Sequence, residues 1–173
     1  MMGRLRHILS DRSGSAAAEM ALISPLLITL MFGSMELGNY FLNEHAVAKA
    51  VRDGARYAAR IPISNYTCTS GSGTGSITGG ETAIKNLTRT GSINGQATPR
   101  LGYWTAASTI TVSVRCVAKA SYGGTFTTLI GDIPVVKVKA DVPYANGSLF
   151  KYVGFTSNGL YLRSESEATV MGI

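Results

Sequence analysis

One carboxylate is conspicuous in the sequence, because Glu19 stands at the start of a segment that is otherwise apolar. The residues that follow, 20–35, contain no Asp, Glu, Lys or Arg. A charged side chain at membrane depth is unfavourable unless a partner neutralises it, so an intramembrane carboxylate indicates a functional site. We therefore predict that the carboxylate of Glu19 has a cationic partner. The alternative is a side chain that reaches the membrane surface from the start of the helix.

Histidines, carboxylates and glycines elsewhere form no recognisable catalytic or metal-binding pattern. His7 precedes the apolar segment and His45 stands alone after it, so neither can anchor a triad or a metal cluster. The Gly-rich residues 67–80 contain no Lys and follow no predicted strand, which excludes a phosphate-binding loop. We therefore predict that the chain is not an enzyme and binds neither a cofactor nor a metal.

The composition bounds the size of the soluble part and its partners. The chain has 173 residues, of which 45% are hydrophobic and 15% charged, and its net charge is +6. Because no cluster of Lys and Arg is interleaved with aromatic residues, no nucleic-acid partner is expected. The part outside the apolar block holds roughly a hundred residues, which is enough for one small core.

The apolar block has the layout of a single membrane-spanning helix. Arg4, Arg6 and Arg12 precede it, and positive charge before a first apolar segment predicts that this end stays in the cytoplasm. As a helix, residues 15–42 would extend about 42 Å, more than the ~30 Å hydrocarbon core of a bilayer. The sequence therefore predicts a helix that crosses the lipid bilayer once. A buried core helix and an ordinary anchor are the alternatives.

A cleaved secretory signal is a further alternative for the same segment. Residues 46–48 and 48–50 both have the small-x-small pattern of a signal peptidase site, and cleavage at the first would make Lys49 the new N-terminus. However, the apolar run is longer than a signal segment, and both sites lie well beyond its end. Because the pattern also continues into an amphipathic helix, we favour the membrane helix.

That amphipathic helix covers residues 39–60. Small apolar residues recur at steps of three and four, which places them on one narrow stripe: Val47, Ala50, Val51, Gly54 and Ala58. Such a stripe allows close approach of a helix from a partner, or packing on the chain's own globular domain. Pro62 ends the helix, because its ring and its missing N–H disfavour continuation.

The residues around Glu19 resemble the processing site of type IV pilin-like proteins, in which a short basic leader ends in Gly and the fifth mature residue is Glu. Gly14 is the corresponding Gly, and Glu19 is the fifth residue counted from Ser15. The wider stretch up to Arg60 resembles the TadE-like family of minor pilins or pseudopilins in tight-adherence (Tad, or Flp; type IVc) pilus systems. Met20 departs from the family pattern, which often has an aromatic residue there. The positions that carry the resemblance are Glu19, Ala21, Pro25, Gly33, Glu36, Gly38 and residues 52–58.

The resemblance implies cleavage by a prepilin peptidase between Gly14 and Ser15, and then assembly with other pilin and pseudopilin subunits on an inner-membrane platform. In such families the fifth-residue Glu is thought to pair with the N-terminal amine of a neighbouring subunit, so Glu19 would set the register of assembly. Pro25 should kink the helix, because it removes one backbone hydrogen bond. Glu36 lies seventeen residues after Glu19, about 25 Å further along the helix axis. We expect an exposed carboxylate there, near the outer membrane surface, that can pair with a partner subunit.

Beyond Pro62, alternation of apolar and polar residues predicts antiparallel strands with one solvated face. Residues 110–118 and 136–142 alternate in this way, and a last strand is predicted within 159–170. The fold class is therefore α+β. A long N-terminal helix, transmembrane in one half and amphipathic and periplasmic in the other, packs on a small antiparallel sheet, as in pilin-like proteins.

The connecting segments have weaker signals. A short helix is predicted within 81–89, before Gly91, and the Gly, Ser and Thr residues of 67–80 predict a flexible or surface-lying segment. Asn-Gly pairs at 146–147 and 158–159 predict turns.

Cys68 and Cys116 are the only cysteines. If the domain beyond the membrane lies outside the inner membrane, its compartment is oxidising and favours a disulfide between them. That bond would close a loop of about fifty residues and stabilise the fold by roughly 4 kcal/mol. The alternative is a buried free thiol, because Cys116 falls on the apolar face of its predicted strand.

Together these features predict a single-pass inner-membrane protein with a cytoplasmic N-terminus and a periplasmic C-terminal domain. It would be cleaved after Gly14 and take part in assembly of a Tad-type adhesive pilus, in which it could also reach the cell exterior. The alternatives are a permanently anchored periplasmic binding or adhesive module and a pseudopilin of a type II secretion apparatus. The predicted segments are a basic leader (1–14), a transmembrane helix (15–42), an amphipathic extension (43–61), a Gly/Ser/Thr-rich connection with a short helix (62–107) and an antiparallel β domain (108–173).

Overall fold

The computed structural model describes residues 13–69, 71, 73–119, 131–144 and 159–172. The chain divides into two compact units. Unit 1 comprises Met1–Asn39 with Gly147–Thr156, and unit 2 comprises Tyr40–Asn146 with Ser157–Ile173. Most of the predicted leader and the predicted turn at 146–147 lie outside the described residues.

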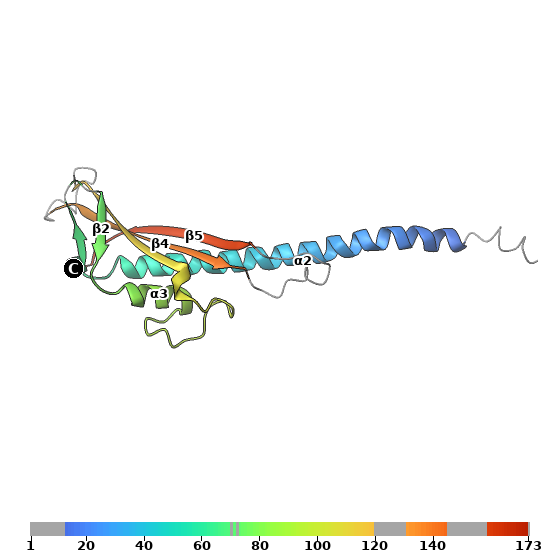
Figure 1. Cartoon of the computed structure of the whole chain (residues 1–173), viewed down its shortest axis with the longest axis horizontal. Coiled ribbons are helices and arrows are strands. Elements are labelled where there is room, and N and C mark those ends of the chain that lie inside the picture. Colours follow the sequence, from blue (N-terminus) through green and yellow to red (C-terminus); the bar gives the residue numbers. More distant parts are fainter. Residues whose placement is uncertain (1–12, 70, 72, 120–130, 145–158, 173) are drawn as a thin grey trace, which may run out of the picture. The chain divides into compact units, whose positions relative to one another are not determined.

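A single helix, α2, runs over Ser13–Ala58, 46 residues in all, and is continuous through Pro25 (Figure 1). Its last turn tightens: the amide of Arg60 donates to the carbonyl of Tyr57 at 3.0 Å, and that of Ile61 to Ala58 at 3.1 Å. Pro62 follows, and the chain leaves the helical path there as predicted from its missing N–H. The predicted long helix is confirmed.

Five strands form one antiparallel sheet in the order β1-β2-β3-β4-β5, so every strand pairs with its neighbour in the described sequence. This sheet and the long helix confirm the predicted α+β class. The three longer strands coincide with the three predicted strand segments. The strand bounds are β1 Tyr66–Cys68, β2 Thr74–Ile77, β3 Ile110–Val117, β4 Ile133–Pro143 and β5 Tyr161–Thr169.

Alternation along the strands separates a buried face from a solvated one. Val138 of β4 is fully buried and pairs with Ser166 of β5, whereas the neighbouring Lys137 pairs with Glu167 on the opposite face. The unit 2 part of α2 runs along this sheet (Figure 1). The buried face and this part of α2 enclose the core, to which α2 contributes Val47, Ala50, Val51, Ala55 and Ala58.

The short helix α3, Glu81–Thr90, completes that core. Ile84 is fully buried, and the helix ends at Gly91, whose φ of 80° is a left-handed conformation that suits glycine. The connection after α3 adds Leu101 and Trp104, which are 8% and 1% exposed. Two single 3-10 turns, η1 at Ile63–Asn65 and η2 at Ala107–Thr109, lead into β1 and β3.

The C-terminal residues bind to the end of α2. The amide of Met171 donates to the carbonyl of Ala59 at 3.0 Å, and the amide of Ile63 donates to Gly172 at 3.0 Å. A Cβ atom at position 172 would overlap the backbone of Ile61, so only glycine fits this approach. These bonds join the C-terminal residues to the segment that follows α2.

The connection after Pro62 contains more regular structure than its composition indicates. Residues 67–80 were expected to form a flexible or surface-lying segment; most of the described ones are exposed, and they also contribute to β1 and form β2. Side-chain propensity there is poor for strands, so the ladder with β3 and the link through Cys68 supply the order that the local sequence does not.

Candidate functional site

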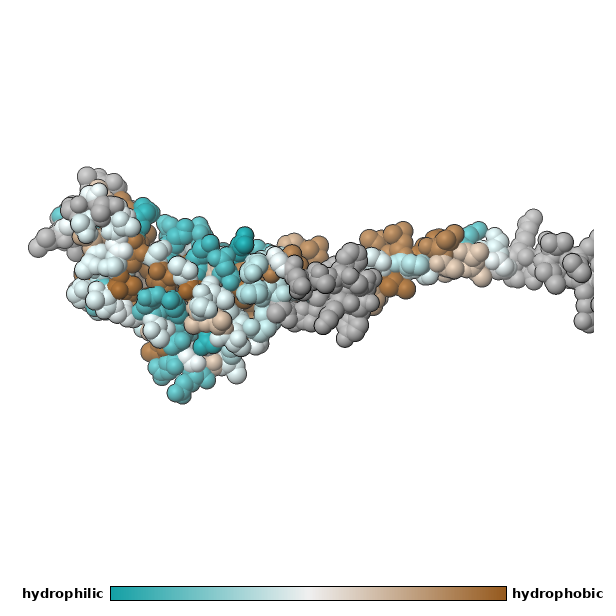
Figure 2. Space-filling model, viewed as in Figure 1, coloured by the Kyte–Doolittle hydropathy of each residue, from teal (hydrophilic) through white to brown (hydrophobic). Residues whose placement is uncertain are grey.

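The N-terminal part of α2 presents apolar side chains on all sides. Every residue from Gly14 to Met31 is exposed in the structure, and Figure 2 shows hydrophobic residues along this stretch. Leu22 is 81% exposed and Leu26 is 62% exposed. A helix that is hydrophobic all round needs a lipid or protein environment to cover it. Two of the candidate assembly residues, Glu19 and Pro25, lie on this surface.

Glu19 lies within this apolar surface. The hydroxyl of Ser15, one turn earlier, donates a hydrogen bond to Oε1 of Glu19 at 3.3 Å. Among the residues that the structure describes, no cation forms a salt bridge with Glu19, which is exposed. The carboxylate is therefore held toward the N-terminal end of the helix but is not neutralised by the described part of its own chain.

Two hydroxyls on the same stretch bind backbone carbonyls. Thr29 donates to the carbonyl of Pro25 at 2.7 Å, and Ser34 donates to that of Met31 at 2.9 Å. Such bonds satisfy hydroxyl groups inside an apolar segment, and Ser and Thr often support the backbone near a proline in this way. The kink at Pro25 stays a prediction.

Glu36 differs from its expected environment. The sequence predicted an exposed carboxylate, but only 5% of Glu36 is exposed. Rise per residue predicts how far along the helix a side chain lies, yet it says nothing about which groups pack beside it. The pairing of Glu36 with a partner subunit stays a prediction.

The stripe of small residues lies inside unit 2. Val47, Ala50, Val51 and Ala58 are fully buried, and Gly54 is buried as well. The stripe therefore packs on the chain's own domain, which was one of the two alternatives.

Gly54 sets the distance between two helices. A Cβ atom at this position would overlap the hydroxyl of Thr88 on α3, which itself donates to the carbonyl of Ile84 at 2.7 Å. Thr88 is fully buried. The absence of a side chain at position 54 thus lets α3 approach α2 closely, as small residues do at other helix contacts.

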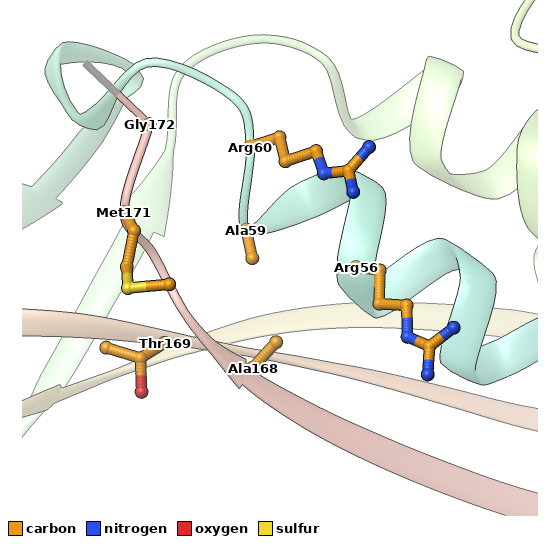
Figure 3. Close-up of a pocket in the computed structure, with 7 residues that line it drawn as sticks. All are labelled: Arg56, Ala59, Arg60, Ala168, Thr169, Met171 and Gly172. Atoms are coloured by element: carbon orange, nitrogen blue, oxygen red, sulfur yellow. The ribbon is translucent and has the colours of Figure 1, made fainter.

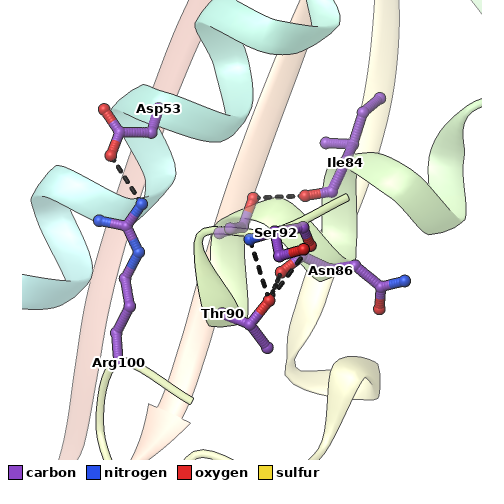
Figure 4. A network of polar contacts seen from close by, with 7 residues as sticks. Asp53, Ile84, Asn86, Thr90, Ser92 and Arg100 are labelled. Carbon is purple, nitrogen blue, oxygen red and sulfur yellow. Dashed lines mark hydrogen bonds and ion pairs between the residues drawn. The ribbon is translucent and has the colours of Figure 1, made fainter. Parts of the chain in front are cut away.

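Asp53 binds the connection that follows α3. The Nη2 atom of Arg100 lies 2.8 Å from Oδ2 of Asp53, and both side chains are partly buried (Figure 4). In the same view the hydroxyl of Thr90 donates to the carbonyl of Asn86 at 2.9 Å and accepts from the amide of Ser92 at 3.1 Å. The Asp53–Arg100 pair holds the connection after α3 against α2, whereas the Thr90 contacts are local to the end of α3, so Asp53 and Gly54 have structural roles in unit 2.

Arg56 and Arg60, which follow Asp53 and Gly54 on the chain, line a groove at the end of α2. The groove is shallow, has a volume of about 760 Å³ and lies between the end of α2 and the end of β5 (Figure 3). The other lining residues are Ala59, Ala168, Thr169, Met171 and Gly172. The groove depends on the C-terminal residues, which carry no local motif, so the sequence did not indicate it.

The predicted disulfide is confirmed. Cys68 of β1 is bonded to Cys116 of β3, with their Cα atoms 5.7 Å apart. Gly75 of β2 lies beneath the bond, since a Cβ atom there would approach Sγ of Cys116 at 2.6 Å. The bond ties the two short strands to the longer ones.

Burial shifts the acidity of two tyrosines. Desolvation raises the pKa of Tyr66 to about 12, with a smaller contribution from Tyr57, and the Tyr66 hydroxyl donates to the carbonyl of Ala58 at 2.6 Å. Desolvation also raises the pKa of Tyr103 to about 12. Both phenols stay neutral in the folded state well above neutral pH, so they act as structural groups.

The solvated face of the sheet carries ion pairs. Nζ of Lys137 lies 2.9 Å from Glu165 and 3.7 Å from Glu167, and Arg115 lies 3.2 Å from Glu167. The hydrogen bond to Glu165 raises the pKa of Lys137, and the charges of both carboxylates act in the same direction. Exposed pairs of this kind contribute little to stability. No group of three or more His, Cys, Asp or Glu residues in the described ranges could hold a metal ion.

The described features define a class of protein: one helix near the N-terminus is long and apolar enough to cross a membrane, which fits a membrane anchor, and it continues into an α+β domain. More particularly, residues 14–56 match the family model of the TadE-like proteins, which confirms the resemblance predicted from the residues. The match suggests a protein associated with Tad pili. The TadE-like family is not a family of enzymes. Comparison with curated proteins and with solved structures finds no match.

Proposed function

We propose that the chain is a minor pilin or pseudopilin subunit that a prepilin peptidase cleaves after Gly14 and that takes part in assembly of a Tad-type adhesive pilus. The observation that carries the proposal is Glu19: an exposed carboxylate on an apolar helix, four residues after Ser15, without a cationic partner in the described part of its own chain. Cleavage would create an amine at Ser15. That amine on one subunit can neutralise Glu19 on its neighbour.

The energetics favour pairing over isolation. A carboxylate surrounded by hydrocarbon is unfavourable alone, and removing one member of a buried ion pair costs about 3–5 kcal/mol. Such a term is large enough to select one register among many possible ways of packing apolar helices. Glu19 then acts as a register residue, and Pro25 and Glu36 assist assembly from further along the same helix.

The proposed topology follows from charge and from the disulfide. Arg4, Arg6 and Arg12 keep the N-terminus in the cytoplasm, and unit 2 lies in the periplasm or, after assembly, in an extracellular pilus. The disulfide between Cys68 and Cys116 supports an oxidising compartment for unit 2. Residues 1–14 are the leader, 15–42 the membrane segment and 43–61 its periplasmic extension.

Intact mass of the chain from membranes, with and without the prepilin peptidase, tests the processing step. We expect a chain that begins at Ser15 when the peptidase is present and at the first residues when it is absent. A full-length chain in both cases would instead identify a permanent anchor. A chain that begins at Lys49 would identify a secretory signal.

The register role has its own test. Glu19→Gln removes the charge with little change in size, so we expect cleavage to continue and pilus assembly to fail. Glu44→Gln is the matched control on the same helix, because Glu44 lies beyond the apolar stretch and in unit 2. Assembly of the Glu19→Gln variant at the normal level would overturn the register role.

A further inference from the structure

The edge of the sheet at β5 has backbone groups available for another strand. The amide of Val170 donates to Pro134 at 3.0 Å, and the amide of Tyr144 donates to Leu160 at 2.9 Å. In an antiparallel ladder the backbone groups of successive residues point alternately to the two sides of a strand. These two bonds therefore show that the amides and carbonyls of even-numbered β5 residues point to β4, and those of odd-numbered residues point to the free edge. Among the described residues, the hydroxyl of Tyr40 caps the carbonyl of Tyr161 at 3.1 Å. No hydrogen bond within the described ranges pairs the edge-facing amides and carbonyls of Arg163, Glu165, Glu167 and Thr169.

The groove beside this edge is basic and partly apolar. Arg56 and Arg60 line it, no carboxylate does, and Met171, which is 67% exposed, adds an apolar side chain (Figure 3). Neither arginine forms an ion pair with any residue that the structure describes. The groove therefore offers two guanidinium groups on the helix side of the β5 edge, where a bound carboxylate would be stabilised.

We propose that the β5 edge and this groove bind an extended acidic segment of a partner protein, which adds to the sheet as a further strand. Such a strand lies about 4.8 Å from β5 and points alternate side chains to the two faces. Its carboxylates on the helix side meet Arg56 and Arg60. A lipid headgroup could bind the arginines but could not use the backbone groups of β5. The inference concerns unit 2 and goes beyond the role proposed for the N-terminal part of α2.

A synthetic peptide tests strand addition on the full chain in detergent micelles. The probe is a fluorescent peptide of about nine residues, near the usual length of a strand, that alternates threonine and glutamate. Fluorescence anisotropy at low salt measures binding. We expect binding that weakens as salt is added, and no binding of the same peptide with lysine in place of glutamate.

Two arginine variants and one control locate the site. Arg56→Glu and Arg60→Glu should each weaken binding about tenfold or more, because repulsion replaces attraction. Arg52→Glu makes the same charge change on the preceding turn but lies outside the groove, so it should leave binding nearly unchanged. All three side chains are exposed, so circular dichroism should show that the variants stay folded.

Methylated peptides test the backbone part of the proposal. N-methyl groups on the threonine amides and on the glutamate amides block opposite edges of the added strand, so one set should abolish binding and the other should spare it. Equal effects of both sets, or equal effects of Arg52→Glu and Arg56→Glu, would overturn strand addition in this groove. So would displacement of the peptide by phosphatidylglycerol without any effect of methylation, which would assign the arginines to a lipid surface.

Discussion

The two parts of α2 both contain many apolar residues, but these residues have opposite environments. Between Gly14 and Met31 every side chain is exposed, whereas in the part that belongs to unit 2 the stripe at Val47, Val51 and Ala58 is fully buried. The TadE-like match, residues 14–56, includes both. The family pattern thus covers two groups of residues. One group packs in the chain's own core, and the other is exposed to whatever surrounds the chain. Changes in unit 2 should alter stability, and changes near Glu19 should alter assembly.

The largest expected effect on stability concerns the disulfide. Cys68→Ser should lower the free energy of unfolding of unit 2 by about 4 kcal/mol, because the bond closes a loop between residues 48 apart in sequence. Denaturant unfolding in micelles can be followed by the fluorescence of Trp104, the only tryptophan, which is 1% exposed. Reduced wild-type protein is the control and should behave like the variant. Equal midpoints for reduced and oxidised protein would contradict the expectation.

The next effect separates two glycines of the same helix. Gly54→Ala should destabilise unit 2 by about 2 kcal/mol, because the new methyl group overlaps the Thr88 hydroxyl in a packed core. Gly38→Ala is the matched control, since nothing lies within 4 Å of a Cβ atom there. Combining Gly54→Ala with Thr88→Ala should recover part of the loss, a coupling that a double-mutant cycle measures. Equal midpoints for Gly54→Ala and Gly38→Ala would remove the contrast between the two parts of α2.

A smaller effect comes from Tyr66. At neutral pH, Tyr66→Phe should cost about 1 kcal/mol through the lost hydrogen bond to Ala58. Because the folded pKa is raised from 10.0 to about 12, the unfolded chain loses its proton first, and stability falls as pH rises across that interval. The Tyr66→Phe variant should lose less stability between these pH values than the wild-type protein. Part of the loss should remain, because the pKa of Tyr103 is raised to about 12 as well. An identical pH profile for both proteins would contradict this account.

The smallest expected effect is on the exposed part of α2. Glu19→Gln should leave the Trp104 unfolding midpoint unchanged, because Glu19 lies in unit 1 and is exposed. The same substitution is expected to block assembly. Loss of stability in parallel with loss of assembly would mean that the two parts of α2 are not separable in the way that their burial indicates.

Local patterns predicted the elements whose own residues specify them. The apolar run and Pro62 bounded α2, alternation located β3 and β4, and the last predicted strand segment contains β5, because each signal lies within a few neighbouring residues. The disulfide was predicted from the presence of two cysteines and from the expected oxidising compartment. In these cases the physical cause of the structure is present in the segment itself.

Other features depend on contacts between distant residues and were therefore missed. The pairing of Asp53 with Arg100 joins residues 47 apart, and Thr88 is buried because Gly54 lies opposite it. Strand β2 consists of Thr, Gly, Ser and Ile and exists because β1 and β3 flank it. The basic groove required the C-terminal residues to return to α2, which no periodicity indicates. A partner for Glu19, if it is another subunit, is absent from any single chain.

The disulfide also limits the ways in which the protein can fold wrongly during oxidation. With two cysteines, the chain has one possible intramolecular pairing, so no reshuffling by an isomerase is required. The bond joins β1 to β3 across 48 residues of sequence, so these two segments of one chain must meet before it can close. The only incorrect oxidised product between copies of this chain is an intermolecular one, formed when a second copy arrives before β3 does. Formation of the native bond therefore depends on the two cysteines of one chain meeting before either meets a second copy, and crowding of unfolded chains would favour the intermolecular product.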